Sequence, residues 1–138
     1  MLRFKVENII KSHQLSVTKI RKKVLRVFLK SLKPLTLQDI RLLVGSIDRI
    51  TLFRILSIFE DKGILHRIRL ENGKVLYALC QEKCQSGKHN HKHIHFKCES
   101  CDNVSCLTID NFPIFSIPNY QFNNISINVS GFCQSCVV

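Results

Sequence analysis

Two Cys-x-x-Cys pairs constrain the fold of this chain more than any other feature of its sequence. One pair is Cys98 and Cys101, and the other is Cys133 and Cys136. Two such pairs can place four thiolates around one tetrahedral ion, which is the usual arrangement of structural zinc. The segment that carries them, residues 93–138, is too short to build a large hydrophobic core by itself. The sequence therefore predicts a small domain that folds around zinc.

Two other uses of these cysteines stay open. The chain has 7 cysteines, and an odd number fits complete disulfide pairing poorly. Its first residues mix charged with apolar side chains, unlike a secretory signal, which argues for a reducing compartment and against disulfides. An iron–sulfur cluster is the second alternative. Because no stretch is apolar over the length of a membrane span, we expect a cytoplasmic protein without a membrane partner.

The positive charge of the chain is concentrated in its first part. The formal net charge is +11. Residues 1–80 carry the whole of this excess, whereas acidic and basic residues balance over 81–138. A concentrated basic surface attracts polyanions such as DNA, although a basic surface that serves only solubility is the simpler reading. An acidic membrane surface would require a basic amphipathic helix with bulky apolar anchors.

Helical periodicity recurs four times in this basic part. Apolar residues over 2–12 stand at helical intervals, and three further helices are expected, each after a side chain that can cap a helix N-terminus. These starts are Thr18, Thr36 and Asp48. Asp39, three residues after Thr36, resembles the second member of a capping box. Glycines are expected to end the last two helices, at Gly45 and Gly63.

Two β-prone runs follow the helices. Residues 64–70 and 74–80 are joined by Glu71-Asn72-Gly73, whose Asn-Gly pair favours a tight hairpin turn. Helices followed by a hairpin predict a winged helix-turn-helix. Further strands are expected near residues 93–98, 103–109 and 120–130. We predict an α+β protein with a winged-helix DNA-binding domain over 1–82, a hinge over 83–92 and a small β-rich metal-binding domain over 93–138.

The predicted fourth helix has a buried side and an exposed side. Its apolar stripe, at i, i+3, i+4 and i+7, consists of Leu52, Ile55, Leu56 and Phe59. The residues off this stripe include two arginines, a threonine and an aromatic ring, namely Arg49, Thr51, Phe53 and Arg54. Guanidinium groups bind phosphates and base edges, and an apolar ring contacts a thymine methyl. We predict that this face binds double-stranded DNA.

Alternating histidines precede the first Cys pair. His89, His91, His93 and His95 would all lie on one face of a strand. His93 and His95 lie close to Cys98 and are therefore predicted metal ligands. His89 and His91 are equally consistent with a solvated His-rich linker.

A His and a Cys of the wing are candidates for the same metal. In a hairpin that turns at Asn72-Gly73, residues whose numbers sum to about 145 face one another. His66 and Cys80 are therefore expected to be close neighbours. Together with His93 and His95, they can complete a four-ligand site between the two domains.

The chain at this point resembles the ferric uptake regulator (Fur) superfamily over nearly its whole length. The motifs that carry the resemblance are Val17-Thr18-x-x-Arg21, Thr51-Leu52-Phe53-Arg54, His93-x-His95-x-x-Cys98-x-x-Cys101 and Gly131-Phe132-Cys133-x-x-Cys136. The resemblance implies a C-terminal dimerisation domain, a homodimer and a palindromic operator. It implies phosphate contacts for Arg21 and Arg54, with Arg49, Thr51 and Phe53 nearest the bases. Phe53 replaces the usual tyrosine, so a phenolic hydrogen bond is lost while the apolar contact remains.

Within the superfamily, the chain is most similar to the zinc uptake regulators (Zur). Cys80 and His66 stand where those proteins place ligands, and Ala78 stands where iron sensors usually have a carboxylate. A thiolate in place of a hard oxygen favours zinc over ferrous iron. The resemblance implies a regulatory zinc site of His66, Cys80, His93 and His95, beside a structural zinc site of Cys98, Cys101, Cys133 and Cys136. Cys106 is a candidate to replace an oxygen ligand of some zinc sensors.

The predicted function is therefore a zinc-sensing transcriptional regulator that represses metal-uptake genes when it is loaded. An iron or peroxide sensor of the same superfamily is the closest alternative. A zinc-binding interaction module without sequence-specific DNA binding is another. A zinc hydrolase would need an open metal position and a general base, and no His-Glu-x-x-His motif is present. We predict that the protein is not an enzyme and has no small-molecule substrate.

Overall fold

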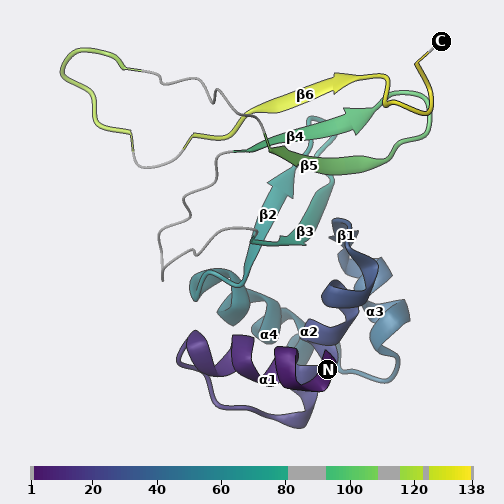
Figure 1. The fold of residues 1–138 in the computed structure, drawn as a ribbon, viewed down its shortest axis with the longest axis vertical. Coiled ribbons are helices and arrows are strands. Elements are labelled where there is room, and N and C mark those ends of the chain that lie inside the picture. The colour runs from purple at the N-terminus through teal and green to yellow at the C-terminus, as the bar shows by residue number, and fades with distance from the viewer. Residues whose placement is uncertain (1, 81–92, 109–115, 123–124, 138) are drawn as a thin grey trace. The chain divides into compact units, whose positions relative to one another are not determined.

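Apart from one two-residue strand, the helices precede the strands along this chain, in agreement with the predicted α+β class (Figure 1). The structure is a computed structural model that describes residues 2–80, 93–108, 116–122 and 125–137. Its elements are α1 (Leu2–Ser12), α2 (Lys19–Ser31), β1 (Leu35–Thr36), α3 (Leu37–Val44), α4 (Arg49–Asp61), β2 (Leu65–Arg69), β3 (Val75–Leu79), β4 (His93–Cys98), β5 (Val104–Thr108) and β6 (Asn128–Gly131). They belong to two compact units, Met1–His89 and Asn90–Val138. The predicted hinge, residues 83–92, lies outside the described residues, and so do Cys84, His89 and His91.

The predicted helix caps are present. Thr18 accepts a hydrogen bond from the Arg21 N–H at the start of α2, and Asp48 accepts one from the Thr51 N–H at the start of α4. Thr36 and Asp39 form a reciprocal capping box at α3, with both donor–acceptor distances at 3.1 Å. The Thr36 N–H lowers the pKa of the Asp39 carboxyl because the bond favours its charged form. These caps confirm that local sequence determines where the helices begin.

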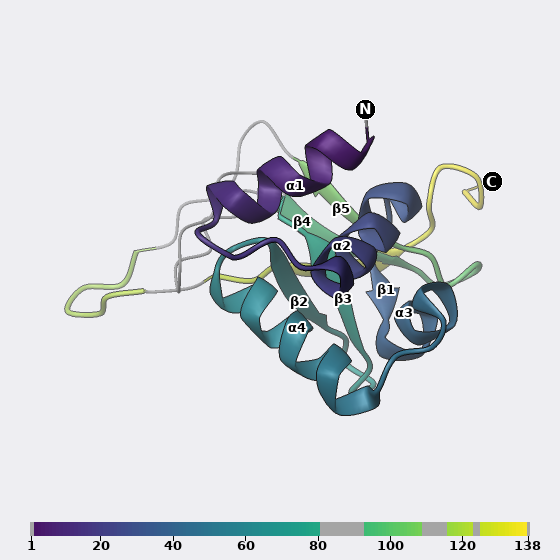
Figure 2. The ribbon, with the colours of Figure 1, turned by 90° about the horizontal axis from the view of Figure 1, so that it is seen from below.

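The first unit has its own hydrophobic core. α2 lies at its centre and packs against α1, α3, α4 and β3 (Figure 2). Phe28 of α2 and Phe59 of α4 are among the largest fully buried side chains. The predicted stripe of α4 is buried throughout, and its residues are Leu52, Ile55, Leu56 and Phe59. No described helix is long and apolar enough to cross a membrane.

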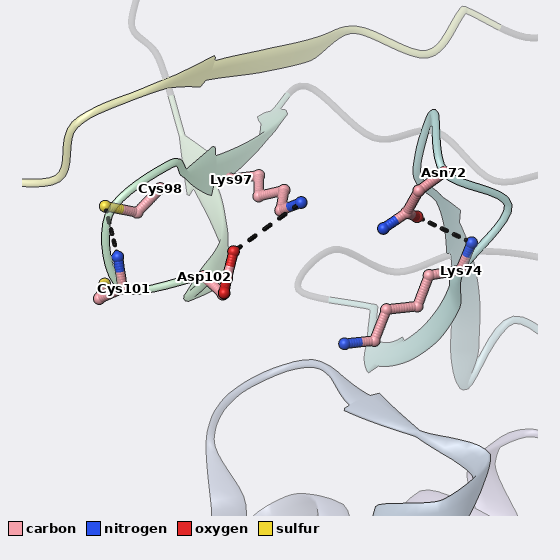
Figure 3. Close-up of polar contacts among 6 residues, drawn as sticks. All are labelled: Asn72, Lys74, Lys97, Cys98, Cys101 and Asp102. Atoms are coloured by element: carbon pink, nitrogen blue, oxygen red, sulfur yellow. Dashed lines mark hydrogen bonds and ion pairs between the residues drawn. The ribbon is translucent and has the colours of Figure 1, made fainter.

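The predicted hairpin forms, and it gains a third strand that the sequence did not indicate. β1 pairs with β3, which gives the strand order β1-β3-β2. Leu70 and Lys74 close a three-residue loop with the Leu70 N–H 2.9 Å from the Lys74 carbonyl oxygen, and Gly73 adopts a φ of 83°. The Lys74 N–H also donates to the Asn72 side chain at 3.0 Å (Figure 3). The loop geometry therefore sets the register of the wing.

Three strands form the sheet of the second unit, in the order β5-β4-β6. β4 runs antiparallel to β5 and parallel to β6. The strands expected near 93–98 and 103–109 are confirmed where residues are described. The strand expected near 120–130 was wrong for the described residues 120–122 and 125–127, and residues 128–130 of that segment lie in β6. Asn119 has a φ of 69°, a conformation that favours a turn over a strand.

The second unit buries very little side-chain surface. Among its residues with described side chains, Cys98 alone belongs to the buried class, with 0% of its surface exposed. Large apolar side chains are instead exposed in this unit, and they are Leu107, Ile117, Tyr120, Phe122, Ile125, Val129, Phe132 and Val137. Side-chain packing among the described residues of the unit is therefore too small a source of stability for a segment of this size.

Candidate metal centres and nucleic-acid interface

The four cysteines of the two Cys-x-x-Cys pairs converge in the second unit. Cys98 ends β4 and lies opposite Gly131 of β6 in the parallel register, so the segments that follow the two strands meet at one end of the sheet. The four Sγ atoms all lie within 4.8 Å of one another, and those of Cys101 and Cys133 are 3.8 Å apart. A tetrahedral zinc ion with Zn–S bonds of about 2.3 Å has S···S edges of about 3.8 Å. The donor set and its spacing fit one zinc ion.

Backbone N–H groups stabilise one thiolate of this cluster. The N–H groups of Cys101 and Cys133 donate to the Cys98 sulfur at 3.5 and 3.4 Å, and Figure 3 shows the first of these bonds. They lower the pKa of Cys98 to about 6. The hydrogen-bonded Cys133 thiol raises the pKa of Cys136 to about 12. Because zinc binds thiolates, metal binding must release the proton of a thiol with a raised pKa such as Cys136.

The turn from β4 to β5, which carries the first two cysteines, is held in a defined shape. Asp102 adopts a φ of 60°, a left-handed conformation that aspartate tolerates better than most residues. Its carboxylate lies 4.0 Å from the Lys97 ammonium on β4 (Figure 3). The Cys98 N–H closes the turn by donating to the Asn103 carbonyl oxygen at 2.9 Å. This closure fixes which residues of β4 and β5 face one another.

A row of three residues crosses the sheet of the second unit. His95 of β4 pairs with Cys106 of β5 on one side and with Asn128 of β6 on the other. A ligand atom of His95 lies within 4.8 Å of the Cys106 Sγ. His95 Nδ1 lies 3.3 Å from the Asn128 Oδ1. Burial raises the pKa of Cys106 to about 11, so this thiol stays protonated at neutral pH until a cation binds.

Sequence reasoning named His95 as a ligand, and it named Cys106 only as a candidate to replace an oxygen ligand of some zinc sensors. The pairing depends on the turn, because a hairpin closed between Cys98 and Asn103 places residue 106 directly opposite residue 95. That closure was not evident from the sequence. Cys106 therefore joins the candidate ligands of the second unit, beside His93, which opens β4.

The wing carries His66 and Cys80 on its two paired strand segments. His66 is buried and lies opposite Ala78, whereas the Cys80 N–H donates to the Ile64 carbonyl oxygen at 2.9 Å. His66 and Cys80 therefore do not form a directly opposed pair. They are diagonal neighbours on the same face of the hairpin, still within reach of long side chains. The three-residue loop closed by Leu70 and Lys74 shifts the register by one residue relative to a two-residue turn.

The exposed face of α4 carries the predicted DNA-contacting residues. Arg49, Phe53 and Arg54 are exposed, and 50% of the Phe53 side chain is accessible. The Thr51 hydroxyl donates to the carboxylate of Asp48, the N-cap of α4, at 3.2 Å. The hydroxyl proton of Thr51 is therefore engaged within the helix cap. Ile50 was missed, although it also lies off the buried stripe, and it is 61% exposed. It stands one helical turn before Phe53, so the two form an apolar strip flanked by arginines.

Two further arginines of the first unit have defined partners. Arg21 Nη1 donates to the backbone oxygen and the hydroxyl of Ser16 at 2.9 and 2.8 Å, which orients its guanidinium beside the loop before α2. Arg67 of β2 forms an ion pair with Glu60 of α4 at 2.8 Å and lies over the Tyr77 ring of β3. The last turn of α4 is therefore tied directly to the wing.

Known proteins resemble this chain over most of its length. A model of the Ferric uptake regulator family matches residues 12–123. The Ferric uptake regulation protein of Staphylococcus epidermidis is 31% identical over 136 residues, which cover 93% of this chain and 91% of that protein. The ferric uptake regulator (Fur) of Vibrio cholerae has 25% identity and a TM-score of 0.63, covering 92% of this chain and 98% of that one. A zinc uptake regulator complexed with zinc and DNA shares the fold, with a TM-score of 0.65 at 19% identity and coverage of 97% and 91%.

These matches agree with the winged helix, the four-cysteine cluster and the exposed basic face of α4. The chain therefore belongs to the Ferric uptake regulator family of metal-dependent, DNA-binding transcriptional regulators, and it is not an enzyme.

Proposed function

We propose that this chain is a zinc sensor that represses metal-uptake genes when it is loaded. The observation that carries the proposal is the cross-strand pair of His95 and Cys106, an imidazole beside a thiol. Ala78, opposite His66 in the wing, contributes no oxygen donor. Nitrogen and sulfur donors favour zinc over the harder ferrous ion. The regulatory ligands of the proposal are His66, Cys80, His93 and His95, with Cys106 as an addition to this set.

The proposed regulation uses donors from both units. His66 and Cys80 belong to the first unit, and the remaining donors belong to the second. When bound, zinc supplies a Lewis-acid centre that both sets of donors can share. Zinc would bind more tightly to those arrangements of the chain in which the donors of both units converge. The equilibrium between arrangements would therefore shift toward them by the difference in zinc affinity. In a homodimer such an arrangement sets the spacing of two α4 helices for the half-sites of a palindromic operator.

A second, structural zinc ion is proposed for Cys98, Cys101, Cys133 and Cys136. Zinc content of protein purified under reducing conditions should fall in two stages, because a closed site of four thiolates releases its ion far more slowly than an open regulatory site. We expect mild chelation to remove one class of zinc and leave the other in place. Quantification of metal and protein before and after chelation is the measurement. Loss of all metal in one step, or iron as the exchangeable metal, would contradict the proposal.

The proposed DNA interface is the exposed face of α4, with Arg54 and Arg21 on phosphates and Arg49, Thr51, Phe53 and Ile50 nearest the bases. The positive charge of residues 1–80 supports this assignment. Exposed Ile50 and Phe53 suit thymine methyl groups. The exposed apolar residues of the second unit, such as Val129 and Phe132, support a homodimer through that unit.

Arg54→Ala should weaken binding to specific and nonspecific duplexes alike. Loss of one phosphate contact releases one counterion fewer, so the slope of log affinity against log salt should flatten by about one unit. The measurement is a gel-shift titration at several salt concentrations, on a duplex selected from a random pool by the wild-type protein. Arg3→Ala on α1 removes the same charge and is the control. An unchanged slope for Arg54→Ala would remove it from the phosphate contacts.

The proposed domain bounds stay 1–82, 83–92 and 93–138, and the proposed site of action is the cytoplasm, where DNA and reduced thiols occur together. An iron or peroxide sensor would use the same interface with another ion. An interaction module without sequence-specific DNA binding would give equal affinity for selected and random duplexes in the same titration.

A further inference from the structure

Asn128 holds a defined place beside a proposed metal ligand. It opens β6 and lies opposite His95 in the parallel register between β6 and β4. Its Oδ1 lies 3.3 Å from the His95 Nδ1. Cys106 lies on the other side of His95, across the antiparallel pair. The amide and the thiol therefore flank one imidazole in a single row across the sheet.

The identity of the contacting atoms determines what the imidazole can do. Oδ1 is an acceptor, so Nδ1 must carry the proton and donate it. In a neutral imidazole the other nitrogen, Nε2, then has the lone pair that a metal requires. A ring whose tautomer and orientation are set in advance loses less free energy on binding a metal. The backbone pairing of β6 with β4 keeps the acceptor in place.

We propose that Asn128 is a positioning residue for His95, which it holds as the Nδ1–H tautomer with Nε2 available to a metal beside the Cys106 thiol. This inference rests on the proposed regulatory site. Strand β6 then contributes to the regulatory site through the hydrogen bond from His95 to Asn128, although β6 supplies none of the proposed ligands. The same strand leads to Cys133 and Cys136, so the structural cluster and the regulatory imidazole share one support.

Cobalt(II) titration tests the proposal on the full chain after mild chelation has removed exchangeable zinc. A thiolate-to-cobalt charge-transfer band reports binding at a site that contains cysteine. Asn128→Ala should weaken cobalt binding about 10- to 100-fold, the usual effect of removing such a partner. Asn128→Asp keeps an acceptor and adds charge, so its affinity should equal or exceed that of the wild type. Ser130→Ala, two residues further along β6, is the matched control and should leave the affinity unchanged.

A second readout does not involve metal. Nitrogen chemical shifts of the imidazole distinguish the two tautomers, and the metal-free wild type should hold His95 as Nδ1–H. Asn128→Ala should give a mixture, and Asn128→Asp should restore the wild-type tautomer. If Asn128 served only to stabilise the strand, His95 would hold the same tautomer in the wild type and in both variants.

The possible failures are distinguishable. If the chelated wild type, whose structural cluster keeps its zinc, binds no cobalt, the proposed regulatory site is wrong. If the wild type binds cobalt and Asn128→Ala binds it equally well, the positioning role is wrong while the site stands. If Asn128→Ala does not fold, Asn128→Asp decides, because weaker cobalt binding than in the wild type would overturn the inference.

Discussion

Cys101→Ser is expected to unfold the second unit while the first unit stays folded. The Cys101 sulfur lies 3.8 Å from that of Cys133, within the four-sulfur cluster. Among the described side chains of this unit, only Cys98 is buried. A structural zinc site stabilises a small domain by on the order of 10 kcal/mol, which exceeds what so little burial can replace. The first unit has a separate hydrophobic core and does not require the ion.

Hydrogen exchange resolved by segment is the measurement for this prediction, together with the zinc content. Amides of β4, β5 and β6 should lose protection, and those of α2 and α4 should keep it. Cys106→Ser removes a thiol of the same sheet outside the cluster and is the matched control. It should retain the tightly held zinc and the protection of β4. Full protection of β4 in zinc-free Cys101→Ser would show that the cluster is not the source of stability.

The second large effect is expected from Cys80→Ser combined with His93→Ala. Metal should increase the affinity of the wild type for its selected duplex by about 5- to 150-fold, the usual range of coupling between two sites. Removing one proposed donor from each unit should abolish this increase. Affinity without metal should stay unchanged, because neither residue belongs to the exposed face of α4.

Gel-shift titrations at fixed salt, with and without buffered zinc, measure this coupling. His13→Ala removes an imidazole whose Nδ1 lies 2.7 Å from the Ile9 carbonyl oxygen at the end of α1, and it should respond to zinc like the wild type. Undiminished zinc dependence in the double variant would disprove the regulatory assignment. If ferrous iron promotes binding at lower free concentration than zinc does, the protein is an iron sensor with the same architecture.

Local features of the sequence were sufficient to predict much of the fold. Side-chain caps such as Asp48 act within three residues, and a buried stripe such as that of α4 follows from helical spacing alone. The spacing of the two Cys-x-x-Cys pairs was sufficient to predict that the four cysteines come together. Reduced cysteines at that spacing are typical of structural zinc sites. These interactions depend on residues close in sequence or on an unusual chemical pattern.

Tertiary structure decided the features that depend on register between strands. The three-residue loop before Lys74 placed His66 opposite Ala78, and the turn closed by Asn103 placed Cys106 opposite His95. The parallel pairing of β6 brought Asn128 to the same imidazole. A shift of one residue turns every side chain of a strand to the other face, and periodicity alone does not determine that choice. The sequence by itself therefore determined the caps, the helices and the four-cysteine cluster, whereas the row of Cys106, His95 and Asn128 required the paired strands.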